Sequence, residues 1–275
     1  MERKVPLHED QVRIPVFLEK YFSKDFSRKK WKRLMEANRV RVNGKVERFS
    51  SRRLSAYDEI QVDLAPEGKD FGQVLYEDSF YYIWNKPPGI LFTDTSTRYL
   101  PAHRLDKETS GALIYAKNPS ALEKMFFLFQ QRKVDKGYIA LVLGALNPKS
   151  GIRKSYIFKE KERYFRSSTC PHPCSKSAET LWSVRKCSSR GSLVYLQPKT
   201  GRTHQLRLHM GDLGHPILGD YHYHKSRCFQ APFVPKRLYL HAQSLRFIHP
   251  FTGEQVDVQS PMPKDFSKAV DQIFE

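Results

Sequence analysis

The sequence has no long hydrophobic segment and few cysteines. No apolar run reaches 18 residues, whereas a helix needs about 20 predominantly apolar residues to span a bilayer. Met1 to Lys4 carry charges and lead into no apolar stretch of the signal-peptide type. Four cysteines among 275 residues do not suggest the disulfide scaffold of a small secreted protein. These absences argue against a membrane or secreted protein, and we expect a cytoplasmic one.

Acidic residues are also scarce relative to basic ones. The chain contains 47 Lys and Arg against 29 Asp and Glu, a formal net charge of +18. Residues 13–53 alone contain 14 Lys and Arg but four acids, an excess that is typical of a phosphate-binding surface. Hydrophobic residues make up 40% of the chain, which is enough for a packed core. The composition therefore predicts a folded protein with a polyanionic partner.

The basic N-terminal region has the pattern of two short helices and a hairpin. Residues 16–22 have the spacing of an amphipathic helix, and Ser27 is a suitable N-cap for a second helix. Residues 39–42 alternate like a strand and lead to Asn43-Gly44, a strong hairpin turn. The apolar face of the second helix comprises Trp31, Leu34 and Met35.

A basic helix followed by the pattern Arg-Val-x-Val-Asn-Gly, in residues 27–45, resembles the S4 RNA-binding domain. The resemblance extends over roughly residues 12–64. It implies contacts with RNA phosphates from the basic side chains of the second helix and the hairpin. These side chains are Arg28, Lys29, Lys32, Arg33, Arg39, Arg41 and Lys45. The alternative is a basic appendage that does not touch RNA.

A linker separates this region from a larger domain. Residues 65–73 contain Pro, Gly and charges without periodicity, so we predict domains at 1–64 and 74–275. The larger domain has the pattern of mixed α and β structure, whereas residues 147–190 are polar and are predicted to be irregular. Strands are expected at 80–84, 112–116, 139–143, 193–196 and 238–247, a helix at 122–129, and a turn with a helix at 201–214.

The segment His-Arg-Leu-Asp-Lys-Glu-Thr-Ser-Gly, residues 103–111, places one acid two positions after an arginine. Such a loop is suited to carry a reactive carboxylate, with Gly111 letting the backbone turn tightly beneath a ligand. Four further segments accompany it: residues 85–89 (NKPPG), 136–140 (KGYIA), 200–220 (from TGRTHQLRLH to LGHPILGD) and 240–242 (LHA). In this order the segments resemble the RluA-type pseudouridine synthases over about residues 74–265.

This resemblance implies an α+β catalytic domain with a mixed, largely antiparallel sheet and flanking helices. It also implies that uridine in RNA is isomerised: the N1–C1′ bond breaks and a C5–C1′ bond forms. The reaction involves no net redox change, so we expect neither a cofactor nor a metal. A single carboxylate can form the covalent intermediate; by resemblance it is Asp106, although the carbon that it attacks stays open.

Three other residues receive roles from the same resemblance. Burial disfavours the ionised form of a carboxylate, and a nearby guanidinium counters this effect. Arg202 is predicted to supply the guanidinium. Tyr138 is predicted to stack on the uracil and to help remove the C5 proton. A uridine in folded RNA must leave its stack, and Arg104 is predicted to fill the vacated space.

Lys86, two cysteines and several histidines are interpreted without a direct part in the reaction. Lys86 lies in a rigid Pro-Pro-Gly turn, and a role in framing the pocket is at least as reasonable as a substrate contact. Cys170 and Cys174 could ligate zinc with scattered partners, but their spacing is unusual for such a site, and we expect no metal. The histidines at positions 103, 204, 209, 215 and 241 are interpreted as hydrogen-bonding supports or RNA contacts.

The sequence thus predicts an RNA pseudouridine synthase that acts on loop uridines of structured RNA, because such bases are easier to extrude. Ribosomal RNA is the favoured substrate and transfer RNA the alternative, and no obligate protein partner is evident. Two other functions are weaker: an RNA-binding assembly factor without catalysis, and a base-removing glycosidase, which would usually require paired carboxylates.

Overall fold

The computed structural model describes residues 2–22, 28–36, 40–62, 73–91, 99–162 and 164–275. The chain divides into two compact units, with the described residues up to 62 in the first and those from 73 onward in the second. The predicted linker at 65–73 lies outside the described residues except for Gln73. Among the described residues, no helix is both long and apolar enough to cross a membrane.

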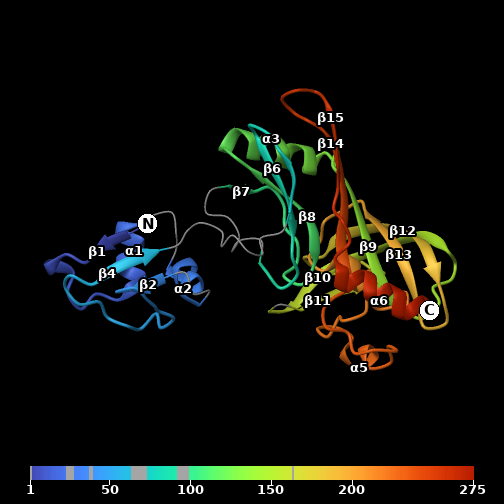
Figure 1. Cartoon of the computed structure of the whole chain (residues 1–275). Helices are drawn as coiled ribbons and strands as arrows, with labels where there is room; N and C mark the ends of the chain where they lie inside the picture. The colour runs from blue at the N-terminus through green and yellow to red at the C-terminus, as the bar shows by residue number, and fades with distance from the viewer. Residues whose placement is uncertain (1, 23–27, 37–39, 63–72, 92–98, 163) are drawn as a thin grey trace. The chain divides into compact units, whose positions relative to one another are not determined.

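The first unit combines two helices with a four-stranded sheet of order β1-β4-β2-β3 (Figure 1). All its strand pairs are antiparallel. Two helices are predicted from the sequence and found, whereas strand β1 and the 3₁₀ turn before α1 were not expected. The elements are β1 (Glu2–Lys4), the 3₁₀ turn (Leu7–Glu9), α1 (Ile14–Tyr21), α2 (Arg28–Glu36), β2 (Val40–Val42), β3 (Lys45–Val46) and β4 (Glu59–Val62).

The core of this unit forms where α1 and α2 pack together and against the sheet. Trp31, Leu34 and Met35 of α2 are buried, as the helical spacing predicts. Asn43 and Gly44 have φ values of +51° and +76°, the left-handed pair that a two-residue hairpin requires. The predicted N-cap Ser27 and the first predicted strand residue, Arg39, lie outside the described residues.

The second unit is built on an eleven-stranded sheet of order β11-β10-β12-β13-β9-β14-β8-β6-β5, with β15 beside β14 and β7 beside β8. Every pair is antiparallel except β14 with β8. The bounds are β5 (Val74–Glu77), β6 (Tyr81–Lys86), β7 (Leu100–Pro101), β8 (Ser110–Ala116), β9 (Asp135–Leu143), β10 (Ser150–Lys161), β11 (Tyr164–Ser168), β12 (Lys176–Cys187), β13 (Gly191–Pro198), β14 (Leu240–Ile248) and β15 (Gln255–Gln259). This largely antiparallel α+β architecture confirms the predicted fold class.

Helices cover parts of this sheet (Figure 1). They are α3 (Pro119–Gln130), α4 (Gln205–Asp212), α5 (Lys225–Cys228) and α6 (Lys264–Phe274). Helix α3 packs on β6, β8, β14 and β15, and α6 packs on β9 and β13. Side chains alternate between the two faces of a strand. Because Ile139 contacts the α6 layer, its neighbour Tyr138 points to the opposite face.

The prediction of irregular structure over residues 147–190 is wrong. This segment forms β10 and β12, each of 12 residues, with the shorter β11. In β10 only Ser155 and Ile157 are fully buried. A strand with so little buried surface carries a weak hydrophobic alternation, which is why its sequence reads as polar.

Gly111 serves a different purpose from the predicted turn beneath a ligand. It lies in β8 with φ +115°, and a Cβ atom there would come within 2.2 Å of the Ala242 carbonyl oxygen. The glycine therefore allows β8 and β14 to approach each other at their parallel pairing.

Candidate active site

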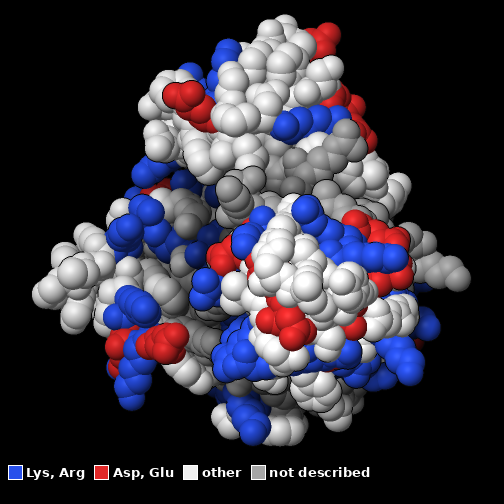
Figure 2. All heavy atoms as spheres, turned by 90° about the vertical axis from the view of Figure 1, so that its left-hand side faces the viewer, with Lys and Arg blue, Asp and Glu red and all other residues white. Residues whose placement is uncertain are grey.

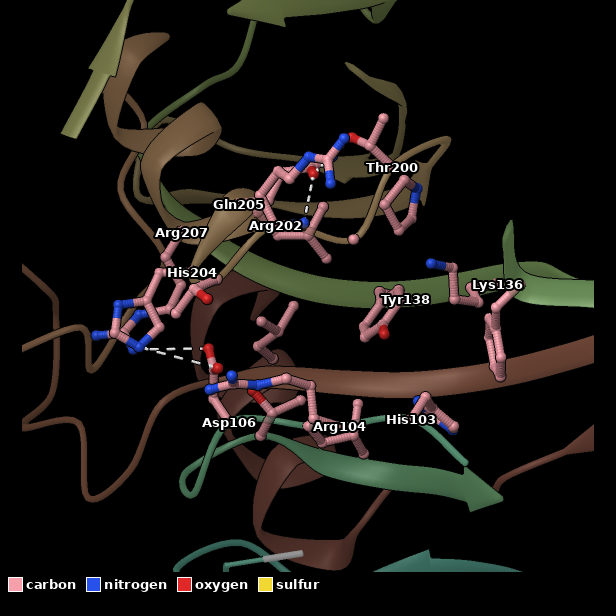
Figure 3. A pocket seen from close by; sticks show the side chains of 18 of the residues that line it. His103, Arg104, Asp106, Lys136, Tyr138, Thr200, Arg202, His204, Gln205 and Arg207 are labelled. Atoms are coloured by element: carbon pink, nitrogen blue, oxygen red, sulfur yellow. Dashed lines mark hydrogen bonds and ion pairs between the residues drawn. The ribbon is translucent and has the colours of Figure 1, made fainter. Parts of the chain in front are cut away.

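Residues of several motif segments of the sequence line one pocket in the second unit, about 360 Å³ in volume (Figure 3). Most of its lining comes from the loop between β7 and β8, strand β9, and the turn that leads from β13 into α4, and the end of α3 and the start of β14 complete it. Among the lining residues are Arg104, Asp106, Tyr138, Arg202, His204 and Arg207. The fold thus brings all four residues of the predicted catalytic set to the same cavity.

Hydrogen bonds to backbone carbonyl oxygens hold the loop that carries Asp106. The Thr109 amide donates to the Asp106 carbonyl oxygen at 3.1 Å, closing a turn. The Lys86 ammonium donates to the carbonyl oxygens of Pro87, Ile90 and Lys107 at 2.9, 2.8 and 3.0 Å. Lys86 is fully buried, and burial lowers its pKa to about 8. Its described contacts therefore support the interpretation that it frames the pocket.

Replacing Lys86 by methionine should lower the free energy of unfolding by about 2–4 kcal/mol, because the carbonyl oxygens of Pro87, Ile90 and Lys107 lose the hydrogen bonds from its ammonium. The unfolded chain keeps this lysine protonated up to pH 10.5, whereas the folded chain releases the proton near pH 8. Between these values the unfolded state binds more protons, so this group makes the wild type more stable as pH rises, by up to about 3 kcal/mol. Urea unfolding of the wild type and of Lys86→Met from pH 7 to 10.5 measures the free energy of unfolding of each protein and its change with pH.

Lys107→Met is the matched control, because Lys107 is exposed and offers only its backbone carbonyl to this network. It should unfold like the wild type at every pH. If Lys86→Met is as stable as the wild type, the ammonium does not hold the loop.

Two side chains of the turn and helix after β13 flank the Asp106 carboxylate. His204 Nε2 lies 3.8 Å from Oδ1, and Arg207 Nη1 lies 3.7 Å from Oδ2 (Figure 3). Both distances exceed that of a hydrogen bond. The carboxylate is therefore compensated electrostatically by Arg207 while its oxygens stay available for reaction.

Arg207 is itself held by a buried acid. Its Nε and Nη2 donate to the two carboxylate oxygens of Asp220 at 2.9 and 2.6 Å, the bidentate geometry that fixes a guanidinium most firmly. Asp220 is only 1% exposed. The third nitrogen, Nη1, is the one that faces Asp106, so Asp220 determines where the positive charge lies.

The prediction that Arg202 pairs with the nucleophile does not match this geometry. Arg202 lines the pocket, but its Nε donates to the Ser177 carbonyl oxygen at 2.9 Å. The guanidinium within 4 Å of Asp106 belongs to Arg207, which sequence reasoning missed. His204 is the N-cap of α4 and Arg207 is its third residue, so the two face the same side of the helix start. That spacing is the signal that could have identified Arg207.

The turn that presents His204 and Arg207 is anchored to β12 through Gln205. The Gln205 side chain donates to the Glu179 carbonyl oxygen and to Thr180 Oγ1, both at 2.9 Å. Its Oε1 accepts hydrogen bonds from the Arg202 amide at 3.0 Å and from Thr200 Oγ1 at 2.6 Å. Because Gln205 is buried, these bonds rigidly set the start of α4.

Tyr138 and Arg104 both line the pocket. Tyr138 lies on β9 with its side chain at the pocket (Figure 3); burial, and to a smaller extent Asp106, raises the pKa of its phenol. Arg104 comes from the nucleophile loop and is exposed at the pocket. The roles of both residues toward a substrate stay predictions.

Most of the histidines support the structure through hydrogen bonds. His209 bonds Ser155 and Thr180, and His241 bonds Ser110. Burial lowers the pKa of His209 and of His241 to about 4, so both rings are neutral donors and acceptors. His204 differs from them because it faces Asp106.

The zinc alternative finds no support in the described part of the chain, where no group of three or more His, Cys, Asp or Glu side chains could hold a metal ion. Cys170 and Cys174 are exposed and free. They lie between β11 and β12.

Several predicted RNA contacts of the first unit are exposed. Arg28, Lys32, Arg41 and Lys45 are accessible to solvent, and Arg28 pairs with Glu19 at 2.8 Å. Figure 2 shows Lys and Arg side chains spread over the face that it presents, with fewer Asp and Glu among them. Arg39 lies outside the described residues, and the side chains of Lys29 and Arg33 are not described.

Comparisons with known proteins identify the family of this chain. Residues 80–212 match the family described as RNA pseudouridylate synthase. A tRNA pseudouridine synthase C of Haemophilus influenzae is 32% identical, over 73% of this chain and 97% of its own. A ribosomal large subunit pseudouridine synthase D of Pasteurella multocida is 30% identical, over 90% of this chain and 87% of its own. The solved structure of human RNA pseudouridylate synthase domain containing 1 has a TM-score of 0.62 at 29% identity, covering 71% of this chain and 84% of that one. The chain belongs to the RNA pseudouridylate synthase family and is an RNA-modifying isomerase.

Proposed function

We propose that this enzyme isomerises uridines of structured RNA, with Asp106 as the nucleophile. Ribosomal RNA is the favoured substrate. The observation that carries the proposal is the position of the Asp106 carboxylate, between Arg207 and His204 in the pocket that Tyr138 also lines. An RNA-binding protein without catalysis has no use for a carboxylate held in this way.

The choice of ribosomal RNA rests on a relative that matches this chain in both units. The relative named for the large ribosomal subunit aligns with 90% of this chain, so the match extends into the basic first unit. A relative named for tRNA aligns with 73% and another named for the large ribosomal subunit with 72%, so matches of about the second unit's length occur with either RNA in the name. Transfer RNA is the alternative substrate.

The chemistry follows from the atoms at the pocket. Asp106 bonds covalently to the flipped nucleotide, which divides a difficult step into two easier ones. The N1–C1′ bond breaks, the base turns over and the C5–C1′ bond forms; the C5 proton then passes to solvent, and N1 takes up a proton from solvent. Arg207 compensates the charge that returns to the carboxylate when the covalent bond to Asp106 breaks. Arg104 occupies the space that the base leaves in the RNA, and Tyr138 stacks on the uracil.

RNA tritiated at C5 of uridine tests this function directly. Isomerisation replaces the C5 hydrogen and releases tritium into water, whereas a protein that only binds RNA releases none. A glycosidase would instead leave abasic sites. Ribosomal RNA and transfer RNA lacking pseudouridine are the two substrates to compare.

Neutralising the basic residues of the first unit should weaken RNA binding and reduce its dependence on salt. In the variant Lys32→Gln, Arg41→Gln, Lys45→Gln, three exposed charges are removed. If all three contact phosphates, the slope of log Kd against log salt concentration should fall by roughly 2 to 3. Filter binding from 50 to 300 mM salt measures the slope, and kcat at saturating RNA should not change.

The matched control removes three exposed lysines of the second unit, as Lys236→Gln, Lys264→Gln, Lys268→Gln. The last two belong to α6, on the sheet face opposite Tyr138. This variant has the same net charge and should keep the wild-type slope. An unchanged slope in the first variant means that these residues of the first unit do not contact the substrate.

A further inference from the structure

His204 adopts a backbone conformation that is uncommon for residues other than glycine. It has φ +57° and ψ +17° at the N-cap of α4, in the left-handed region that non-glycine residues seldom occupy. Such strain persists only where the surroundings impose it, and it is concentrated at functional sites. The conformation directs the imidazole toward Asp106, with Nε2 at 3.8 Å from Oδ1.

The other ring nitrogen of His204 contacts Tyr223. Nδ1 lies 2.6 Å from the Tyr223 hydroxyl oxygen. The same oxygen accepts a hydrogen bond from the Phe165 amide of β11 at 3.2 Å. A phenol has a single hydrogen. The amide occupies an acceptor site of this oxygen, so the arrangement that satisfies both groups directs the phenolic hydrogen to Nδ1, with Nδ1 as the acceptor.

This arrangement leaves the imidazole proton on Nε2. Burial lowers the pKa of His204 to about 4, with Arg207 and His222 acting in the same direction and Asp106 and Asp220 opposing them. Burial also raises the pKa of Tyr223 to about 12. The ring is therefore neutral and the phenol protonated at physiological pH, so an Nε2–H group faces the acceptor oxygen of Asp106.

Tyr223 supports the other flank of the nucleophile as well. Its ring lies 5.0 Å from the central carbon of the Arg207 guanidinium, in cation–π contact. One residue outside the pocket lining thus touches both groups that flank Asp106. The ring can hold Arg207 without the hydroxyl. The contact of the hydroxyl with His204 can therefore be tested separately from the contact of the ring with Arg207.

We infer that Tyr223 is a positioning residue whose hydroxyl fixes the tautomer of His204, so that an N–H donor faces Asp106. The inference rests on the proposed function of Asp106 as nucleophile. When the covalent bond between Asp106 and the nucleotide breaks, its electron pair returns to the carboxylate, and the donor stabilises that charge. Substrate binding must shorten the 3.8 Å gap by about 1 Å for a hydrogen bond to form.

Tyr223→Phe removes the hydroxyl and keeps the ring against Arg207. We expect kcat to fall about tenfold, with KM for RNA within twofold of the wild type. Tyr221→Phe is the matched control, because the Tyr221 hydroxyl donates to the Pro235 carbonyl oxygen, and its kcat should not change. A Tyr223→Phe enzyme with wild-type kcat, or with a loss confined to KM, overturns the inference.

A double variant separates the tautomer from the contact with β11. If the hydroxyl acts through His204, adding Tyr223→Phe to His204→Ala causes no further loss of kcat. If it acts through the Phe165 amide, the same tenfold loss recurs in the His204→Ala background, and the inference is wrong.

The tautomer can be measured without any turnover. In ¹⁵N-labelled protein, the ring nitrogens of His204, assigned by their absence in His204→Ala, should show protonated Nε2 and unprotonated Nδ1 in the wild type and a mixture in Tyr223→Phe. Protonated Nδ1 in the wild type overturns the inference. A wild-type protein that shows the expected tautomer but releases no tritium contradicts the proposed function instead, so the two failures are distinguishable.

Discussion

Asp106→Asn should abolish isomerisation, with a loss of at least about 1,000-fold in kcat. The amide has the same shape as the carboxylate but carries no charge and is not a nucleophile. Arg207 and His204, which flank the two carboxylate oxygens, would face a neutral group without losing their own positions. Tritium release measures the loss, and filter binding should give an RNA affinity within about threefold of the wild type, because the remaining contacts are unchanged.

Asp257→Asn is a suitable control for the removed charge. Asp257 pairs with Arg246 on β14, is partly exposed and is not among the residues that line the active-site pocket. This variant should be fully active. Turnover by Asp106→Asn within a hundredfold of the wild type would mean that another group is the nucleophile.

The strands that lie beneath the site could be predicted because they are continuous apolar runs. All seven residues of β8 are buried, and the last seven of β9 are also buried. A strand covered on both faces reads as an uninterrupted hydrophobic segment. Asp106 and Tyr138 could be placed because their motif segments resemble those of the family; Asp106 precedes β8, and Tyr138 lies within β9.

The guanidinium partner of Asp106 could not be placed in the same way. Arg202 and Arg207 occur in one ten-residue segment, and the residue types alone do not distinguish them. The difference is where the turn ends and α4 begins, at Gln205. That boundary depends on the buried bonds from Gln205 to Glu179 and Thr180, which join the turn to β12. Because β12 was predicted to be irregular, its influence on the site was not foreseen.

Arg207→Met should reduce kcat by at least about a hundredfold, because the charge of Asp106 loses its nearest compensating guanidinium. The matched variant Arg202→Met removes a guanidinium from the same segment, yet its contact is with the Ser177 carbonyl, and kcat should fall less than about tenfold. Single-turnover tritium release measures both. If Arg202→Met is the more damaging of the two, the pairing seen in the structure is not the one used in catalysis.

A loss of stability must be separated from a loss of catalysis in this experiment. Arg207→Met leaves the Asp220 carboxylate, 1% exposed, without its bidentate partner, at a cost of about 3–5 kcal/mol. Adding Asp220→Asn removes the buried charge and should recover most of that stability in a urea titration. If the double variant is stable and still inactive, the catalytic loss comes from the charge beside Asp106. If its activity recovers together with its stability, Arg207 only maintains the fold, and Asp106 reacts without a compensating guanidinium.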